Sequence, residues 1–152
     1  MLNPPCPQEP VEGRDYIIID PAKGSGDAQV SALADLLEKN GPRGPTPLVS
    51  RMRQLRQRLQ QDLPTGEKVM LSIVTDGLPT SPTNGKSMPG DQRDFVEELR
   101  QFAAAFNSFI IIRLCTDDGE AVGYYNKVDE EVELSLDILD DLQGEAQEVY
   151  DG

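Results

Sequence analysis

The sequence contains no histidine among its 152 residues. This absence excludes Ser-His-Asp and Cys-His nucleophile systems, histidine general bases and zinc sites with imidazole ligands. Any chemistry must therefore use carboxylates, hydroxyls, lysines or a hard metal ion. Aromatic residues are also scarce, at 5% of the chain, so we expect a core that is mostly aliphatic.

Cysteines and long apolar runs are scarce too. Cys6 and Cys115 lack metal-ligand spacing, which favours free thiols in a reducing compartment. No run approaches the roughly 20 apolar residues that a membrane-spanning helix needs. The N-terminal residues lack the apolar stretch of a signal peptide. We therefore expect a cytoplasmic protein that does not insert into membranes.

Basic residues are outnumbered by acidic ones, 14 to 27, which gives a net charge of −13. Such a charge opposes general binding to nucleic acid phosphates and to anionic membranes. It favours cations or basic protein surfaces instead. We expect a protein partner and no nucleic acid.

The chain length accommodates one domain with a hydrophobic core. We expect a Pro-rich, disordered leader over residues 1–13, one domain over 14–142 and an acidic tail over 143–152. Residues 117–128 are expected to form a connection. The predicted elements are strand 15–20, helix 27–38, helix 48–62, strand 68–75, a helix from Asp91, strand 108–116 and a short strand or helix over 131–142.

This alternation of strands and helices predicts an α/β fold: a three-layer, Rossmann-like, mostly parallel sheet flanked by helices. The strands at 68–75 and 108–116 are nearly continuous apolar runs, so we expect both to be buried on both faces. In such sheets ligands bind beyond the carboxyl ends of the strands. Asp76 follows the first of these strands and opens a long loop over 77–90, so it is the leading site candidate.

Two short motifs occur together in the sequence. "GPTPL" at 44–48 opens a helix, and "VTDG" at 74–77 ends a strand. Their order and spacing resemble the second half of a von Willebrand factor type A domain, over about residues 14–140. The resemblance implies a metal-ion-dependent adhesion site that holds Mg²⁺, with Thr46 and Asp76 as ligands. It also implies that a partner protein completes the metal shell with a carboxylate. The loop that would contact this partner contains Gly77, Pro79, Thr80 and Ser81.

The sequence departs from that family at the first strand, which should end in Asp-x-Ser-x-Ser. The nearest match is "DPAKG" at 20–24, with alanine and glycine in place of the serines. We interpret 15–20 as the family's third strand, so the first strand, first helix and second strand are missing. This loss predicts exposed sheet edges and an incomplete shell that binds Mg²⁺ weakly or not at all. We expect a fragment, a mispredicted gene model or a degenerate member of the family.

Other interpretations of the same residues stay open. Asp76 can be a simple turn residue, and Thr46 can cap the helix at 48–62. The arginines of that helix are more typical of a solvated face than of a partner surface. An α/β enzyme could hold a metal for hydrolysis or phosphoryl transfer through Asp76 with Asp117 or Asp118, although no nucleophile motif is present. A scaffold without a ligand is a third option. We predict a protein-binding module and no enzymatic activity.

Overall fold

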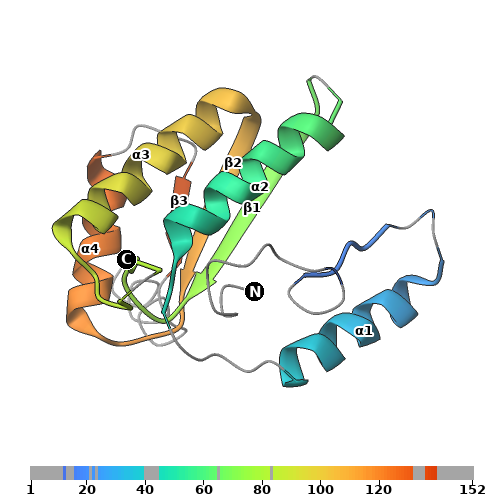
Figure 1. Cartoon of the computed structure of the whole chain (residues 1–152), viewed down its shortest axis with the longest axis horizontal. Coiled ribbons are helices and arrows are strands. Elements are labelled where there is room, and N and C mark those ends of the chain that lie inside the picture. The colour runs from blue at the N-terminus through green and yellow to red at the C-terminus, as the bar shows by residue number, and fades with distance from the viewer. Residues whose placement is uncertain are drawn as a thin grey trace, which may run out of the picture.

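The computed structural model describes residues 12, 16–20, 22, 24–39, 45–64, 66–82, 84–131 and 136–139. The predicted tail over 143–152, and the predicted leader except for Glu12, lie outside these residues. The elements in chain order are α1 (Gly26–Lys39), α2 (Leu48–Asp62), β1 (Lys68–Thr75), α3 (Pro89–Ala105), β2 (Asn107–Leu114), α4 (Gly119–Glu131) and β3 (Leu136–Leu139) (Figure 1).

The three strands form one parallel sheet in the order β1-β2-β3. Lys68 pairs with Asn107 at one end of the β1–β2 ladder, and Thr75 pairs with Leu114 at the other. Parallel neighbours need long crossover connections, and α3 and α4 provide them. The predicted α/β class with a parallel sheet is confirmed.

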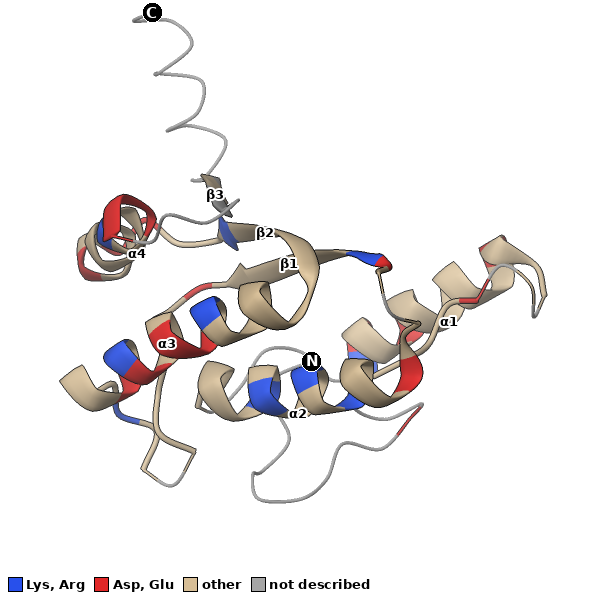
Figure 2. Cartoon of the chain, turned by 90° about the horizontal axis from the view of Figure 1, so that it is seen from above, with Lys and Arg blue, Asp and Glu red and all other residues tan. Residues whose placement is uncertain are grey.

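The core lies between one face of this sheet and the helices. On that face β1 contributes Ile73, and β2 contributes Ile110, Ile112 and Leu114, at alternate positions. Figure 2 shows α2 and α3 on the same side of the sheet. The helical side chains of the core are Leu48, Met52, Phe95, Leu99, Phe102, Tyr125 and Val128. Within this core the rings of Phe95 and Tyr125 meet edge to face, with their centroids 6.2 Å apart.

The opposite face of the sheet is exposed along β1 and half-buried at Ile111 and Arg113 of β2. Met70 is 73% exposed, Val74 is 59% exposed and Phe109 of β2 is 42% exposed. The prediction that both strands are buried on both faces is therefore wrong for this face. Among the described residues no element covers it, so they form two layers and not the expected three.

The predicted strand at 15–20 is wrong as well. Tyr16 forms only an isolated bridge with Glu12, and residues 17–20 have no regular structure. A strand depends on a partner for its backbone hydrogen bonds. The sheet of the described residues offers none to this segment, and Ile18 and Ile19 remain exposed.

Residues 119–131 form α4, where the sequence predicted a connection. The buried residues Ala121, Tyr125 and Val128 of α4 follow helical spacing, so a signal was present. The other predicted helices match α1, α2 and α3, although α1 lies apart from the sheet (Figures 1 and 2). No helix in the described part of the chain has the length and apolar character to cross a membrane.

Candidate functional site

The carboxyl ends of β1 and β2 meet at one edge of the sheet, as expected for parallel neighbours. The N–H of Cys115 donates to the carbonyl of Thr75 at 2.9 Å, which continues the ladder just beyond β2. Asp76 follows β1 here, and Asp117 and Asp118 follow β2. The site candidates therefore share an edge, where loops rather than regular elements position them.

A pair of reciprocal hydrogen bonds brings Thr46 to the loop after β1. The Thr46 N–H donates to Thr80 Oγ1 at 2.7 Å, and the Thr80 N–H donates to the Thr46 carbonyl at 2.9 Å. That carbonyl also accepts from the N–H of Leu48 at 2.8 Å. The residue preceding α2 is Pro47, and no side chain caps this helix. The alternative role of Thr46 as a side-chain cap is therefore wrong, and its hydroxyl makes no hydrogen bond among the described residues.

The hydroxyl groups of two buried residues fix the turn after β1. Both the buried Thr75 hydroxyl and the Tyr125 hydroxyl donate to the carbonyl of Gly77, each at 3.0 Å. The N–H of Gly77 donates back to Thr75 Oγ1 at 3.3 Å. Burial, with a smaller contribution from Tyr124, raises the pKa of the Tyr125 hydroxyl well above its usual value, so it remains a donor at neutral pH.

Asp76 is exposed at this turn. Its carboxylate makes no hydrogen bond or ion pair with any other described residue. The side chain of Pro79, three positions on, is fully buried, so it packs the loop instead of contacting a partner. Ser81 is half-buried, and its backbone N–H donates to the carbonyl of Lys86 at 3.1 Å. Of the predicted contact loop, Gly77, Thr80 and Ser81 remain partly accessible.

The aspartates after β2 have a different environment. Asp118 Oδ1 accepts a hydrogen bond from the Glu120 N–H at 3.0 Å, and the Asp118 carbonyl accepts from the Val122 N–H at 3.0 Å. These contacts make Asp118 the cap of α4. Asp117 is exposed. One carboxylate of the alternative enzymatic pair is therefore occupied by a structural role.

The donor atoms at this edge suit a hard cation only in part. The Thr46 hydroxyl and the Asp76 carboxylate are both oxygen donors without a protein partner among the described residues, and Mg²⁺ prefers oxygen ligands. The same residues contain no group of three or more acidic, cysteine or histidine side chains placed to hold a metal. An ion with only these two protein ligands would take the rest of its shell from water, which makes a weak site.

Comparison with known proteins finds no matching family model, no matching curated protein and no matching solved structure. The site is therefore described by its own contacts. Sequence reasoning missed the roles of Thr75 and Tyr125 in fixing the turn. Tyr125 lies 48 positions from Gly77, and no local pattern signals a contact over that separation.

Proposed function

We propose that this chain is a von Willebrand A-like protein-binding module, with a partial metal site at the carboxyl edge of its sheet. The observation that supports this most directly is the reciprocal pair of hydrogen bonds between Thr46 and Thr80. It joins the loop before α2 to the loop after β1, the two segments that carry the "GPTPL" and "VTDG" motifs. The exposed Asp76 lies at the same edge.

The proposal includes the three-layer, Rossmann-like fold of that family. The described residues supply part of it: a parallel sheet in the order β1-β2-β3 with helices on one face. The uncovered second face agrees with a missing layer. The domain proposed over 14–142 extends beyond the described residues at both ends.

In this proposal Thr46 and Asp76 hold Mg²⁺, and a carboxylate of the partner protein completes the ion's oxygen shell. The Thr75 and Tyr125 hydroxyls keep the turn at Gly77 fixed, so Asp76 is positioned before a partner arrives. The chain's net charge of −13 favours cation binding, and an ion at this edge would offset the repulsion between Asp76 and the partner's carboxylate.

An enzyme that uses these carboxylates has less support, because Asp118 caps α4 and the sequence has no nucleophile motif. A domain without any ligand is the remaining alternative. Simple measurements separate the three options. Hydrolysis of p-nitrophenyl phosphate would indicate the enzyme, and metal-dependent capture of a partner would indicate the binding module. A stable fold with neither property would indicate the domain without a ligand.

The first test is an NMR titration of the ¹⁵N-labelled chain with MgCl₂, combined with thermal melts in Mg²⁺ and in EDTA. We expect amide shifts confined to residues 46–48 and 75–81. At ten times Kd the ion adds about 1.4 kcal/mol of stability, which raises Tm by about 3–6 °C. Asp76→Asn should abolish both effects. Asp117→Asn is the matched control, because it removes the same charge from the same edge.

Amide shifts and melts that do not change in millimolar Mg²⁺ would contradict the metal part of the proposal and favour the scaffold. If Asp76→Asn and Asp117→Asn reduce the Mg²⁺-dependent amide shifts and the rise in Tm equally, only the general negative potential of the chain attracts the ion.

A further inference from the structure

In the described part of the chain β1 lies at the edge of the sheet, and one side of its backbone has no neighbouring strand. Among the described residues it pairs only with β2. Because the Thr75 carbonyl accepts from Cys115 beyond β2, the N–H and C=O of Thr75 point toward β2. These groups alternate in direction along a strand. Those of Met70, Ser72 and Val74 therefore point to the free side, where they can pair with another extended backbone.

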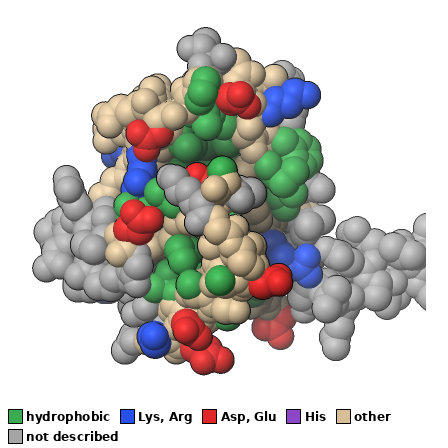
Figure 3. All heavy atoms as spheres, turned by 90° about the vertical axis from the view of Figure 1, so that its right-hand side faces the viewer, with side chains coloured by type: hydrophobic (Ala, Val, Ile, Leu, Met, Phe, Trp, Pro, Cys, Tyr) green, Lys and Arg blue, Asp and Glu red, His purple; other side chains and the backbone are tan. Residues whose placement is uncertain are grey.

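Of the four outward-facing residues of β1, Met70 and Val74 are apolar, and the other two are Lys68 and Ser72. Met70 and Val74 are mostly exposed, and Phe109 extends the same apolar face from β2, in register with Met70. In soluble proteins, prolines, bulges or inward-pointing charges prevent an exposed edge strand from pairing with another chain. β1 has no proline, its register with β2 is uninterrupted, and its only charged residue is the terminal Lys68. Figure 3 views the molecule from the side on which α1 lies, and hydrophobic side chains reach the surface there among charged ones.

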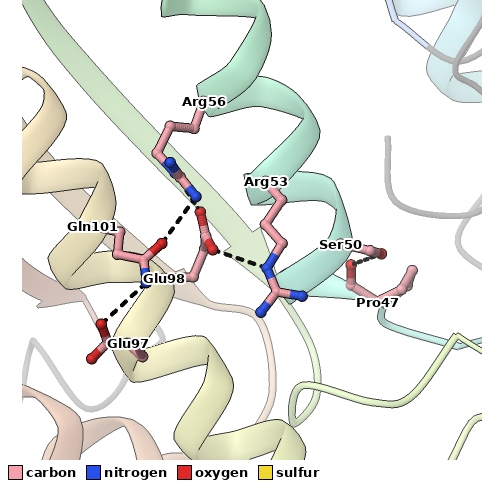
Figure 4. Close-up of polar contacts among 7 residues, drawn as sticks. All are labelled: Pro47, Ser50, Arg53, Arg56, Glu97, Glu98 and Gln101. Carbon is pink, nitrogen blue, oxygen red and sulfur yellow. Dashed lines mark hydrogen bonds and ion pairs between the residues drawn. The ribbon is translucent and has the colours of Figure 1, made fainter.

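A positive charge lies beside this edge, on α2. Arg53 and Arg56 project toward α3, where both contact Glu98 (Figure 4). Successive residues turn by about 100° in a helix, so Arg51 lies about 160° around α2 from Arg53, on the flank away from α3. Figures 1 and 2 show that this flank and the free side of β1 have the same orientation, opposite to α3 and β2.

Arg51 has no charge partner among the described residues. Its side chain is only 9% exposed, and Nε and Nη2 have no hydrogen-bond partner, while Nη1 donates to the Gln54 side chain at 2.8 Å. Arg58, on the same flank, is already engaged with the Tyr16 ring and with Asp62. A buried guanidinium with unpaired donors is unfavourable, and a carboxylate satisfies it best.

We propose that the free edge of β1 binds an extended, mostly apolar segment of a partner polypeptide, which adds a strand to the sheet and places a carboxylate against Arg51. The edge supplies the backbone groups, Met70 and Val74 supply the apolar contact, and Arg51 supplies the charge selectivity. This mode of recognition is β-strand addition. It uses a different surface from the loops around Thr46 and Asp76.

A second copy of this chain fits the edge less well. A two-fold symmetric contact places the same patch on both sides, so the arginine flanks of two α2 helices would face each other. That flank carries Arg51 and Arg58, whereas Arg53 and Arg56 project toward α3. Like charges at close range oppose that arrangement, and an acidic apolar partner removes the conflict.

The test uses short synthetic peptides and residue-resolved amide hydrogen exchange of the whole chain. The probes are acetylated and amidated heptapeptides of alternating valine and threonine, with one glutamate at each polar position in turn. Two control sets replace glutamate with glutamine or methylate alternate backbone nitrogens. We expect at least ten-fold slower exchange at Met70, Ser72 and Val74 with a glutamate peptide, weaker binding with glutamine, and no effect after methylation.

Two substitutions in the protein locate the site. Ser72→Pro removes an outward N–H without touching the bonds to β2, so it should abolish binding while the far-UV circular dichroism stays native. Ser72→Thr keeps that N–H and should bind normally. Arg51→Gln should bind the glutamate and glutamine peptides equally.

The proposal is overturned if no glutamate peptide slows exchange at these amides, or if the methylated peptides do so equally well. Protection that instead rises with protein concentration, without peptide, would assign the edge to a second copy of the chain.

Discussion

Glu98 is a carboxylate enclosed between α2 and α3, and replacing its closest partner should measurably destabilise the fold. Only 1% of its side chain is exposed. Arg56 Nε lies 2.6 Å from Oε1 and is 20% exposed, whereas Arg53 Nε lies 3.1 Å from Oε2 and is 52% exposed. Removing one partner of a buried ion pair costs about 3–5 kcal/mol, because the remaining charge stays buried.

Arg53 still neutralises part of that charge, so we expect Arg56→Met to cost about 2–3 kcal/mol. Methionine keeps the apolar stem, so the loss reports the guanidinium and not the packing. Arg53→Met is the matched control. Half of that side chain is in water, and exposed pairs contribute about 0–1 kcal/mol. Urea denaturation followed at 222 nm gives both free energies of unfolding.

A double substitution separates charge from shape. Arg56→Met with Glu98→Leu removes the buried charge together with its partner, so most of the stability lost in Arg56→Met should return. The reasoning fails if Arg53→Met costs as much as Arg56→Met, or if the double variant is the least stable of all.

Further predictions use the same denaturation assay. Leu99→Ala should cost about 3–4 kcal/mol because its side chain is fully buried in the core, whereas Ala104→Ser on the exposed face of α3 should change stability by less than about 0.5 kcal/mol. Thr80→Val removes the acceptor for the Thr46 N–H and should cost about 1 kcal/mol, while Thr80→Ser retains it; equal costs would contradict the contact. Burial raises the pKa of Tyr125 above the usual 10.0, so the folded chain keeps this proton while the unfolded chain loses it. Stability should therefore fall as pH rises above about 10, and Tyr125→Phe should fall less steeply; parallel curves would contradict this.

The sequence predicted those parts of the fold that local patterns determine. The apolar run over 68–75 and the one over 108–116 identified β1 and β2, and the leucine spacing of 48–62 identified α2. The segment at 15–20 has the same β-branched character, yet it is not a strand. Strand formation depends on a neighbouring strand, and a single sequence does not show whether that neighbour is present.

The candidate site was predictable to a similar extent. The position of Asp76 follows from the strand that precedes it, because parallel strands direct their carboxyl ends to one edge. The proximity of Thr46 to this loop was expected only from the family resemblance. The contact of Tyr125 with Gly77 closes a separation of 48 residues through α4, an element that the sequence analysis missed.

The exposed face of β1 is the most informative of these differences, because its apolar residues predict burial whereas the structure leaves them exposed. A strand with one solvated face alternates apolar and polar residues, so that face of β1 should be polar at positions 70 and 74. It has methionine and valine there, 73% and 59% exposed. On the covered face, at Ile73, composition and burial agree. The covered face of β1 therefore agrees with its burial, whereas the uncovered face carries apolar residues at two of its four positions. Threonine at 70 and 74 would serve a solvated edge equally well and aggregate less. Binding of the extended segment proposed above would cover Met70 and Val74, and a carboxylate in that segment would pair with Arg51, whose Nε and Nη2 have no hydrogen-bond partner among the described residues.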